Sequence, residues 1–573
     1  MQQEVLSNTM TVADAYLSLL SDRGVDCIFA NAGTDFAPII EAFAKAQATG
    51  GKTPRAVTVP HENVAVAMAQ GYYCVTGRPQ VVMVHVSVGT ANTICGALNA
   101  HRAGIPLILS AGRSPITEEG VKGTRDTHIH WPQEMFDQAG MVREATKWDY
   151  ELRMGETIET VVDRALNIAM SAPRGPVYLT LPREVLASTL PGFKPQYSGR
   201  RVAATDPSPD PAAIDEAADL IAKAENPVII SGTGQDPASW HALTALAENH
   251  VLPVVQFLTR FQSLSSDHPM NLGYNPKALL EAADVVVVLD SMVPWLPTYH
   301  RCPPNAKVIQ IAPDPNFTFI PIRGFPANIA ITSSATAACR ALDAALAERS
   351  AKSKTKLDAR RKKLADQRAK LVEGWNAEIQ RGKKETPVHP AWIGHCINQV
   401  KGEDAIVVKE AGLPQQFLQF TKPRTFLAPG AAGGLGYGMG TALGAKMAAP
   451  DKLVIACEGD GSYMFCCPIA AHFVSAQEKA PVLWIVFNNG RWNAVQTATR
   501  QVNPTGYASK SNREVLTYLS TEMNYEKAVE VAGGYGEKVT DPAEFPKALD
   551  RAVKEVQVNK RQALLNVVCS GGL

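Results

Sequence analysis

The stretch Cys457–Trp492, CEGDGSYMFCCPIAAHFVSAQEKAPVLWIVFNNGRW, contains two apolar runs that each end in a polar, glycine-rich turn. The first run ends in Glu-Gly-Asp-Gly, which includes Asp460, and the second ends in Asn-Asn-Gly, which includes Asn489. A segment of helical length separates the runs, which are therefore predicted to be two parallel strands of an α/β sheet. Because the carboxyl ends of parallel strands meet at one edge, we expect Asp460 and Asn489 to lie close together.

The same alternation of short apolar runs and helical patterns fills the rest of the chain. The runs predicted as strands are 25–33, 79–89, 105–112 and 175–182 in the first third, 226–234, 252–257, 283–290 and 306–315 in the middle third, and 404–412, 452–461, 481–490 and 562–570 in the last third. This rhythm is typical of parallel sheets with helices on both faces. The expected fold class is α/β, with three doubly wound, mostly parallel-sheet domains.

Composition places the boundaries between these domains. A proline-rich stretch, 190–213, interrupts the first alternation and is predicted to be a linker. The basic, helix-prone stretch 351–375 has no interleaved aromatic residues, which favours a solvated helix between two domains over a nucleic-acid contact. The predicted segments are a first domain over 1–190, a middle domain over 205–345, a basic helical linker over 346–384 and a last domain over 385–573.

Bulk composition excludes several classes of partner. The 573 residues include 56 lysines and arginines and 55 acidic residues, and a formal charge of +1 offers no attraction to nucleic acid or to an anionic membrane. No run of about 18 apolar residues predicts a membrane span, and the N-terminal segment lacks the pattern of a signal peptide. The ten cysteines form no C-x-x-C metal pattern and are expected to be free, mostly buried thiols of a cytoplasmic protein.

The two strand ends of the opening stretch offer hard oxygen ligands. A carboxylate, an amide oxygen and nearby backbone carbonyls suit octahedral Mg²⁺, which keeps coordination positions for phosphate oxygens. Asp460 and Asn489 thus point to a metal-bridged diphosphate. Two unrelated strand-end turns are the alternative interpretation, because Asp-Gly and Asn-Gly are common turn pairs.

The motif GDG, followed after 26 further residues by NN, resembles the signature of thiamine diphosphate (ThDP) enzymes. With the three α/β domains, the chain resembles, over essentially its whole length, the superfamily of decarboxylases and acetohydroxyacid synthases. The resemblance implies a pyrimidine-binding (PYR) first domain, a Rossmann-like middle domain and a diphosphate-binding (PP) last domain. The Mg²⁺ ligands that it implies are Asp460, Asn489 and the main-chain carbonyl of Arg491. The other cofactor contacts that it implies in this stretch are Gly459, Gly461 and Ser462.

Two further elements of the ThDP machinery are identified by the same resemblance. The family places a glutamate after the second strand to protonate the pyrimidine, and Glu62, at the start of an apolar helix in VTVPHENVAVAMAQGYY, matches it. Its structural alternative is an acidic residue that complements the helix dipole. The loop GAAGGLGYGMGTALGA, 430–445, resembles the loop that supports the bent cofactor, with Gly433 and Leu435 gripping the pyrimidine edge.

The substrate-facing residues are also matched by resemblance. FANAGTDFAPIIEAF resembles the first loop of benzoylformate decarboxylases and puts Thr34 at their pocket serine, although Ala32 replaces the usual proline. HVSVGTAN puts His85 at their catalytic histidine, and a histidine of near-neutral pKa can relay protons. Gln133 matches a loop glutamine of acetolactate synthases and acyl-CoA lyases. The roles of His128, His130 and His300 stay open.

The resemblance implies a ThDP- and Mg²⁺-dependent enzyme that breaks or forms a C–C bond in a 2-oxo acid, through a C2 carbanion and an enamine. It would act as a decarboxylase or as an acetolactate synthase-like carboligase. A 2-hydroxyacyl-CoA lyase, which releases an aldehyde or ketone and formyl-CoA, is the first alternative. A catalytically silent regulatory subunit is the second, and the presence of Glu62, Asp460 and the asparagine pair speaks against it. No strand opens into G-x-G-x-x-G, which excludes a nicotinamide-linked oxidoreductase.

The sequence says less about other cofactors and about partners. The turn SGTGQDP, 231–237, is too short a glycine signal to support FAD or ADP in the middle domain and is interpreted as structural. The expected partner is a small 2-oxo acid or 2-hydroxyacyl substrate. The resemblance also implies a homodimer or homotetramer with shared active sites, since family sites combine the PYR domain of one chain with the PP domain of another.

Overall fold

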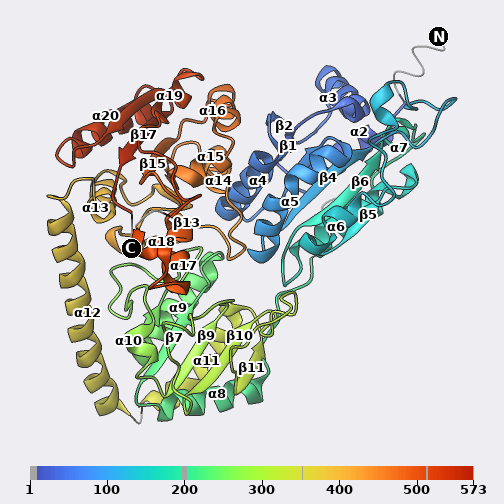
Figure 1. Ribbon diagram of the computed structural model, residues 1–573. Coiled ribbons are helices and arrows are strands. Elements are labelled where there is room, and N and C mark those ends of the chain that lie inside the picture. Colours follow the sequence, from blue (N-terminus) through green and yellow to red (C-terminus); the bar gives the residue numbers. More distant parts are fainter. Residues whose placement is uncertain (1–8, 197–202, 352, 512–513, 572–573) are drawn as a thin grey trace. The chain divides into compact units, whose positions relative to one another are not determined.

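Three parallel β-sheets with helices packed against them make up the part of the chain that the computed structural model describes, residues 9–196, 203–351, 353–511 and 514–571 (Figure 1). Contacts between residues group the chain into two compact units. The first combines the chain up to Thr205 with 432–451 and 463–480, and the second combines 206–431, 452–462 and 481–573. The predicted fold class, α/β with three parallel-sheet domains, is confirmed.

The first unit contains one six-stranded sheet of order β2-β1-β3-β4-β6-β5, in which every strand pair is parallel. Its strands are β1 (Cys27–Ala30), β2 (Arg55–Thr58), β3 (Gln80–Val84), β4 (Leu107–Arg113), β5 (Asp149–Glu151) and β6 (Val177–Pro182). Its main helices are α2 (Val12–Asp22), α3 (Ala37–Thr49), α4 (Glu62–Thr76), α5 (Val86–Arg102), α6 (Ile158–Met170), α7 (Arg183–Ala187), α14 (Gly438–Ala448) and α16 (Pro468–Gln477). The central strands β3 and β6 are buried along their whole length and β4 up to its last residue, as expected for a sheet covered on both faces.

Helices α4 and α14 pack with their backbones in close contact. A Cβ atom on Gly71 would lie 2.0 Å from the carbonyl oxygen of Thr441, and one on Gly444 would lie 1.9 Å from that of Met68. Only glycine permits this approach. Residues 62–74 of α4 are all buried, which is the state expected of a helix that is enclosed on every side.

The second unit contains two parallel sheets, ordered β11-β10-β9-β7-β8 and β13-β12-β14-β15-β17-β16. The strands are β7 (Pro227–Ser231), β8 (Val254–Val255), β9 (Val285–Leu289), β10 (Lys307–Ala312), β11 (Ile329–Thr332), β12 (Ile406–Lys409), β13 (Phe426–Leu427), β14 (Val454–Gly459), β15 (Leu483–Asn488), β16 (Tyr535–Val539) and β17 (Ala563–Val568). The helices are α8 (Pro211–Lys223), α9 (Pro237–His250), α10 (Lys277–Leu280), α11 (Ala335–Ala351), α12 (Lys354–Gly382), α13 (Pro390–Val400), α17 (Asn493–Val502), α18 (Tyr507–Ser511), α19 (Glu526–Glu530) and α20 (Phe545–Gln557). Helix α15 (Asp460–Phe465) follows β14 directly.

The basic stretch predicted as a helical bridge forms the long helix α12 (Figure 1). Most of its charged side chains are exposed, but two arginines lie against the middle sheet's domain. Arg360 donates to the carbonyl of Ala224 at 2.7 Å, and Arg368 donates to that of Ser266 at 2.7 Å. The positive charge of this helix therefore serves, in part, to cap carbonyl groups of the neighbouring domain.

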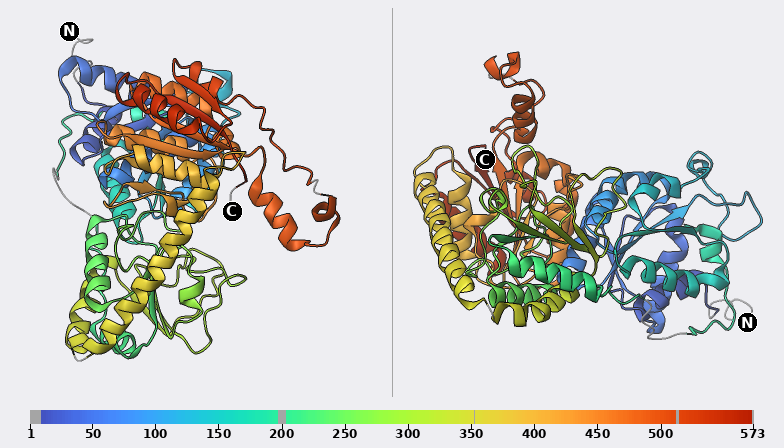
Figure 2. Two further views of the ribbon diagram at one scale, coloured as in Figure 1. Left: turned by 90° about the vertical axis from the view of Figure 1, so that its left-hand side faces the viewer. Right: turned by 90° about the horizontal axis from the view of Figure 1, so that it is seen from below.

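The state of the cysteines and the hydropathy of the helices agree with the predictions made from the sequence. All ten cysteines lie in the described residues, none of them forms a disulfide, and most are buried. Within the described ranges, none of the helices is both long and apolar enough to cross a membrane. Figure 2 shows α17 and α18 extending away from the last sheet. Val502 in α17 and Tyr507 in α18 are exposed.

Candidate active site

Asp460 and the Asn488-Asn489-Gly490 turn meet at one sheet edge, as the sequence predicts. Strands β14 and β15 pair in parallel, and Asp460 follows the end of β14. The side chain of Asp460 accepts hydrogen bonds from the backbone N–H of Gly461 at 2.9 Å and from that of Gly490 at 2.8 Å. The residue is only 2% exposed. The carboxylate thus joins the two strand ends directly.

The ligand atoms at this edge fit a magnesium ion by their chemistry. Burial raises the pKa of Asp460, while hydrogen bonds from the amides of Gly461 and Gly490 act in the opposite direction. The Oδ1 atom of Asn489 accepts from the backbone N–H of Arg491 at 3.0 Å, and the carbonyl of Arg491 accepts from Asn493. A carboxylate from one strand end meets an amide oxygen and a carbonyl oxygen from the turn at the next, and these are ligand types that Mg²⁺ prefers.

Of the two glycines that flank Asp460, Gly461 has no room for a side chain and Gly459 has little. A Cβ atom on Gly461 would lie 2.2 Å from the ring of Trp492, and one on Gly459 would lie 3.2 Å from the Cβ of Ala411. Ser462 is buried beside them. The backbone itself therefore forms the surface at this strand end, which is what close approach to a diphosphate requires.

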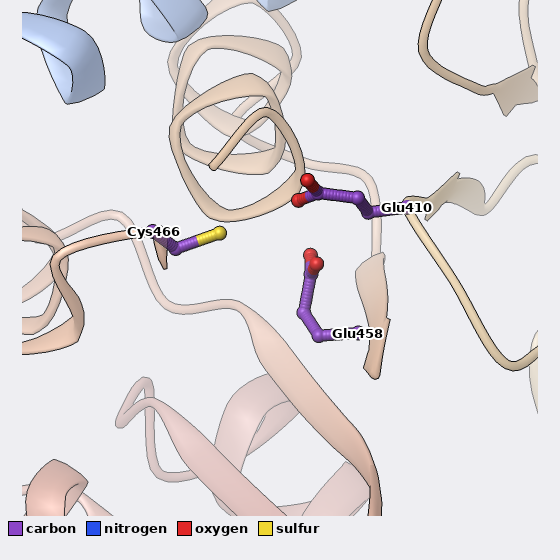
Figure 3. Close-up of side chains that lie close together, drawn as sticks. All are labelled: Glu410, Glu458 and Cys466. Carbon is purple, nitrogen blue, oxygen red and sulfur yellow. The ribbon is translucent and has the colours of Figure 1, made fainter. Parts of the chain in front are cut away.

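A buried acid pair lies next to the same motif. Figure 3 shows the carboxyl groups of Glu410 and Glu458, which follow β12 and belong to β14, pointing toward each other. Their nearest ligand atoms are within 4.8 Å. Glu458 is fully buried, and neither of its carboxyl oxygens has a hydrogen-bond partner within 3.5 Å among the described residues. Burial, and then the charge of Glu410, raise the pKa of Glu458 well above its usual range.

Glu62 lies where the sequence places it, as the first residue of α4. His61 caps this helix by accepting the backbone N–H of Asn63 at 3.2 Å. Glu62 is 7% exposed, and its Oε2 atom accepts a hydrogen bond from the side chain of Asn92 at 3.1 Å. An acidic residue that only complemented the helix dipole would be solvated, so this burial favours a chemical role.

The loop that contains Gly433 and Leu435 is hydrogen-bonded to α5. Asn99 donates to the carbonyl of Gly434 at 2.8 Å and accepts its N–H at 3.1 Å. The thiol of Cys95 lies 3.5 Å from the carbonyl of Leu435. Gly433 has a φ of 68°, which favours glycine. Because Asn92 also belongs to α5, one helix contacts both Glu62 and the loop.

His85 lies in a cluster of polar side chains at the ends of β1 and β3. Its Nδ1 atom is 2.5 Å from a carboxylate oxygen of Asp35, which is buried, and its Nε2 atom is 3.3 Å from the side-chain nitrogen of Gln133. The hydrogen bond to Asp35 outweighs burial and raises the pKa of His85. The structure thus brings His85 and Gln133 together and adds Asp35.

Thr34 pairs with a different histidine. Its hydroxyl lies 3.1 Å from Nε2 of His130, whose Nδ1 accepts the backbone N–H of Asp126 at 3.2 Å. Nε2 of His130 therefore donates to Thr34, and burial lowers the pKa of this histidine. His128 is exposed. His300 is buried, accepts the N–H of Leu296 and packs edge-on against Phe257, contacts that describe a structural histidine.

Family models identify the chain's relatives. The model described as thiamine pyrophosphate enzyme, N-terminal TPP binding domain, matches residues 10–141. The central-domain model of the same enzymes matches 214–342, and the C-terminal TPP binding domain matches 411–567. Thiamine pyrophosphate is another name for ThDP. The chain belongs to the ThDP enzymes.

Curated relatives that span most of the chain are a decarboxylase, an acetolactate synthase and an acetyltransferase. The chain is 26% identical to benzoylformate decarboxylase of Pseudomonas aeruginosa over 85% of this chain and 87% of the relative. It is 26% identical to the large subunit of acetolactate synthase isozyme 3 of Escherichia coli over 98% and 95%. Sulfoacetaldehyde acetyltransferase of Rhodobacter capsulatus is 27% identical over 97% and 94%.

Solved structures share the fold at lower identity. Benzoylformate decarboxylase of Polynucleobacter necessarius superposes with a TM-score of 0.78 at 20% identity, covering 98% of this chain and all of the other. The 4-hydroxybenzoylformate decarboxylase of Rhodococcus jostii gives 0.77 at 20% identity, over 98% and 99%. These likenesses support the fold of a ThDP enzyme.

Four polar residues of this ThDP enzyme escaped the sequence interpretation. Asn92 and Asn99 lie seven residues apart, with Cys95 between them, and this spacing on one face of a helix was a detectable signal. Asp35 follows Thr34 in a loop where several polar residues occur. Glu458 stands in an otherwise apolar strand, and its charge within a buried run was the signal there.

Proposed function

We propose that this ThDP enzyme uses Mg²⁺ and breaks or forms a C–C bond next to the carbonyl group of a 2-oxo acid, as a decarboxylase or an acetolactate synthase-like carboligase. The observation that supports this most is the buried Asp460 carboxylate, which joins the two strand ends of the GDG and NN turns through the 2.8 Å bond from Gly490. Decarboxylases and acetolactate synthases are among the relatives that span most of the chain.

In this proposal each part of the site has one task. Bound ThDP supplies a nucleophilic carbon that can hold an acyl group's electrons. Asp460, Asn489 and the Arg491 carbonyl bind Mg²⁺ against its diphosphate, and Gly459, Gly461 and Ser462 line the approach. Glu62 keeps a proton on the pyrimidine, and the loop of Gly433 and Leu435 borders that ring. Thr34, His85 and Gln133 face the substrate, and His85 takes up and returns protons.

Reconstitution tests the cofactor assignment. Wild-type protein should bind ThDP only with Mg²⁺, as measured by calorimetry. Asp460→Asn should weaken this binding by about 100-fold or more, because the site loses its only charged ligand and a charge-assisted hydrogen bond of about 1.5–3 kcal/mol. Asp451→Asn, an exposed acid of the same predicted domain, is the matched control and should bind as the wild type does. Unchanged, Mg²⁺-dependent affinity in Asp460→Asn would show the metal assignment to be wrong.

Product analysis tests the reaction. The holoenzyme is incubated with pyruvate, benzoylformate and a 2-hydroxyacyl-CoA, and CO₂, aldehyde, ligated product and acyl-CoA are followed by mass spectrometry. We expect CO₂ from at least one 2-oxo acid and a loss of about 10²–10⁴-fold in Glu62→Gln, with Glu41→Gln on the exposed face of α3 as control. Acyl-CoA cleavage without CO₂ release would replace the 2-oxo acid assignment.

We further infer a homodimer or homotetramer with shared sites. Light scattering of the holoenzyme should give a mass of two or four chains. A monomer with full activity would contradict this.

A further inference from the structure

We propose that Asp35 is a positioning residue that holds His85 with its proton on Nδ1, so that Nε2 is the atom that exchanges protons with the substrate. This inference rests on the proposed function of the same site. The carboxylate of Asp35 lies 2.5 Å from Nδ1 and accepts its hydrogen bond. The Asp35 side chain is 2% exposed and that of His85 is 18% exposed, so the carboxylate is enclosed while the imidazole reaches the site.

Two glycines make room for this pair. A Cβ atom on Gly33 would lie 2.1 Å from Nδ1 of His85, and one on Gly112 would lie 1.8 Å from a carboxylate oxygen of Asp35. Neither side chain could occupy its present place if these positions carried even a methyl group. The geometry of the pair is therefore set by the backbone on two sides.

The backbone after His85 is strained in a way that fits this arrangement. Val86 has a φ of 33°, a conformation that is rare and strained for a β-branched residue. The N–H of the same residue lies 3.4 Å from Asp35. Strain of this kind persists where the surroundings hold a residue in place, and it clusters at functional sites.

Gln133 completes the assignment of the proton. Its amide nitrogen faces Nε2 at 3.3 Å, and a donor in that position requires an unprotonated Nε2. The other amide atom, Oε1, is buried without a partner among the residues that the structure describes. When Nε2 gains a proton, a half-turn of this amide presents Oε1 to it. Gln133 can therefore hydrogen-bond both states of His85.

The charges around His85 favour a reversible exchange of protons between its Nε2 atom and the substrate. Asp35 contributes the most to raising the pKa of this histidine, the distant charge of Glu62 adds to it, and burial opposes both. His130 is the other titratable group that interacts with His85, and burial lowers its pKa. In one cycle the product gains one proton in place of CO₂, and Nε2 delivers this proton after taking it up from water. Any proton that Nε2 takes from the substrate is returned to it, and Asp35 balances the imidazolium meanwhile. No electron transfer is needed, and the solvent supplies the proton that is consumed.

Nitrogen NMR of histidine-labelled protein tests the tautomer without reference to turnover. The signals of His85 are assigned by their loss in His85→Gln. In the wild type we expect a protonated Nδ1 and an unprotonated Nε2 above the titration midpoint. Asp35→Asn should abolish this preference and lower the midpoint. Gly112→Ala, which displaces the carboxylate without removing it, should do the same and serves if Asp35→Asn fails to fold.

Glu184→Gln is the matched control, because Glu184 is also a buried acid of the same unit and its carboxylate accepts hydrogen bonds from Thr117 rather than from His85. It should leave the His85 signals in place. An unchanged tautomer and midpoint in both Asp35→Asn and Gly112→Ala would overturn the inference.

The pH profile of kcat/KM gives the second readout. The acidic limb should move to lower pH in Asp35→Asn with a lower plateau, and adding Asp35→Asn to His85→Gln should cost nothing more. A uniform loss at all pH values, with the limb unmoved, would mean that Asp35 is only structural. Absence of turnover in the wild type would instead refute the proposed function, while the NMR result would still decide the role of Asp35.

Discussion

Replacement of Gly33 by alanine is expected to reduce kcat/KM by roughly tenfold to a hundredfold. Gly33 has φ and ψ of −131° and −169°, an extended conformation that alanine adopts equally well, so the effect comes from the added methyl group alone. That group would lie 2.1 Å from Nδ1 of His85, whereas ordinary contact begins at 3.4 Å. The ring must therefore withdraw by about 1.3 Å.

Asp35 cannot follow the ring, because its carboxylate is already confined against Gly112. The hydrogen bond between Asp35 and His85 is then lost. A charge-assisted hydrogen bond contributes about 1.5–3 kcal/mol, and each 1.4 kcal/mol corresponds to a factor of ten. A displacement of about 1 Å in a catalytic group is known to cost a comparable factor.

The assay is steady-state kinetics with the 2-oxo acid that the holoenzyme accepts, together with calorimetry of ThDP. The affinity for ThDP should stay within about twofold of the wild type, because Glu62 and Asp460 are untouched. The control is Gly374→Ala in α12, where a Cβ atom meets no described atom within 4 Å. This variant should keep full activity and gain about 0.5–1 kcal/mol of stability. Wild-type kcat/KM in Gly33→Ala would refute the placement of His85.

Three further variants test the fold around the site. Gly71→Ala should lower the thermal midpoint by several degrees, because its Cβ would lie 2.0 Å from the Thr441 carbonyl and overpacking costs about 1–3 kcal/mol; differential scanning fluorimetry would contradict this with an unchanged midpoint. Glu458→Met should raise the midpoint by a few degrees, since an unsatisfied buried polar group costs about 1–3 kcal/mol; a lower midpoint would mean that the acid pair is stabilising. Burial, aided by the charge of Arg102, lowers the pKa of His101 to about 4, so stability that this group contributes is present above about pH 6.5 and is lost as the pH falls toward 4. Between pH 7 and pH 4.5, His101→Asn should therefore lose less of its midpoint than the wild type does, and equal losses would argue against the buried neutral form.

The strand ends of the site were predictable because they follow from local pattern. An apolar run that stops at a glycine-rich turn, as before Asp460 and Asn489, indicates both a parallel strand and the edge at which it ends. The position of Glu62 at a helix start followed in the same way. Resemblance supplied His85 and Gln133 as separate residues, and the structure places them within hydrogen-bonding distance.

The remaining contacts depend on packing between segments that are distant in the chain. Asp35 and His85 are 50 residues apart in the sequence, and nothing in the local pattern of either loop predicts the hydrogen bond between them. The same holds for Asn99, whose partner Gly434 is 335 residues away. Such contacts follow from the order of strands in a sheet and from glycines that allow close approach, which a single sequence does not reveal.

The glycine-mediated packing of α4 on α14 decides which segments of the chain can be exchanged with those of a relative. Glu62 begins α4, and the loop of Gly433 and Leu435 leads into α14. The close backbone contact of the two helices therefore fixes the distance between Glu62 and this loop. A chimaera that exchanges only the first 190 residues with those of a relative would bring in an α4 surface without its matching glycines. Recombination between relatives should therefore succeed only when residues 432–451 are exchanged together with the N-terminal segment, although more than 200 residues separate the two in sequence.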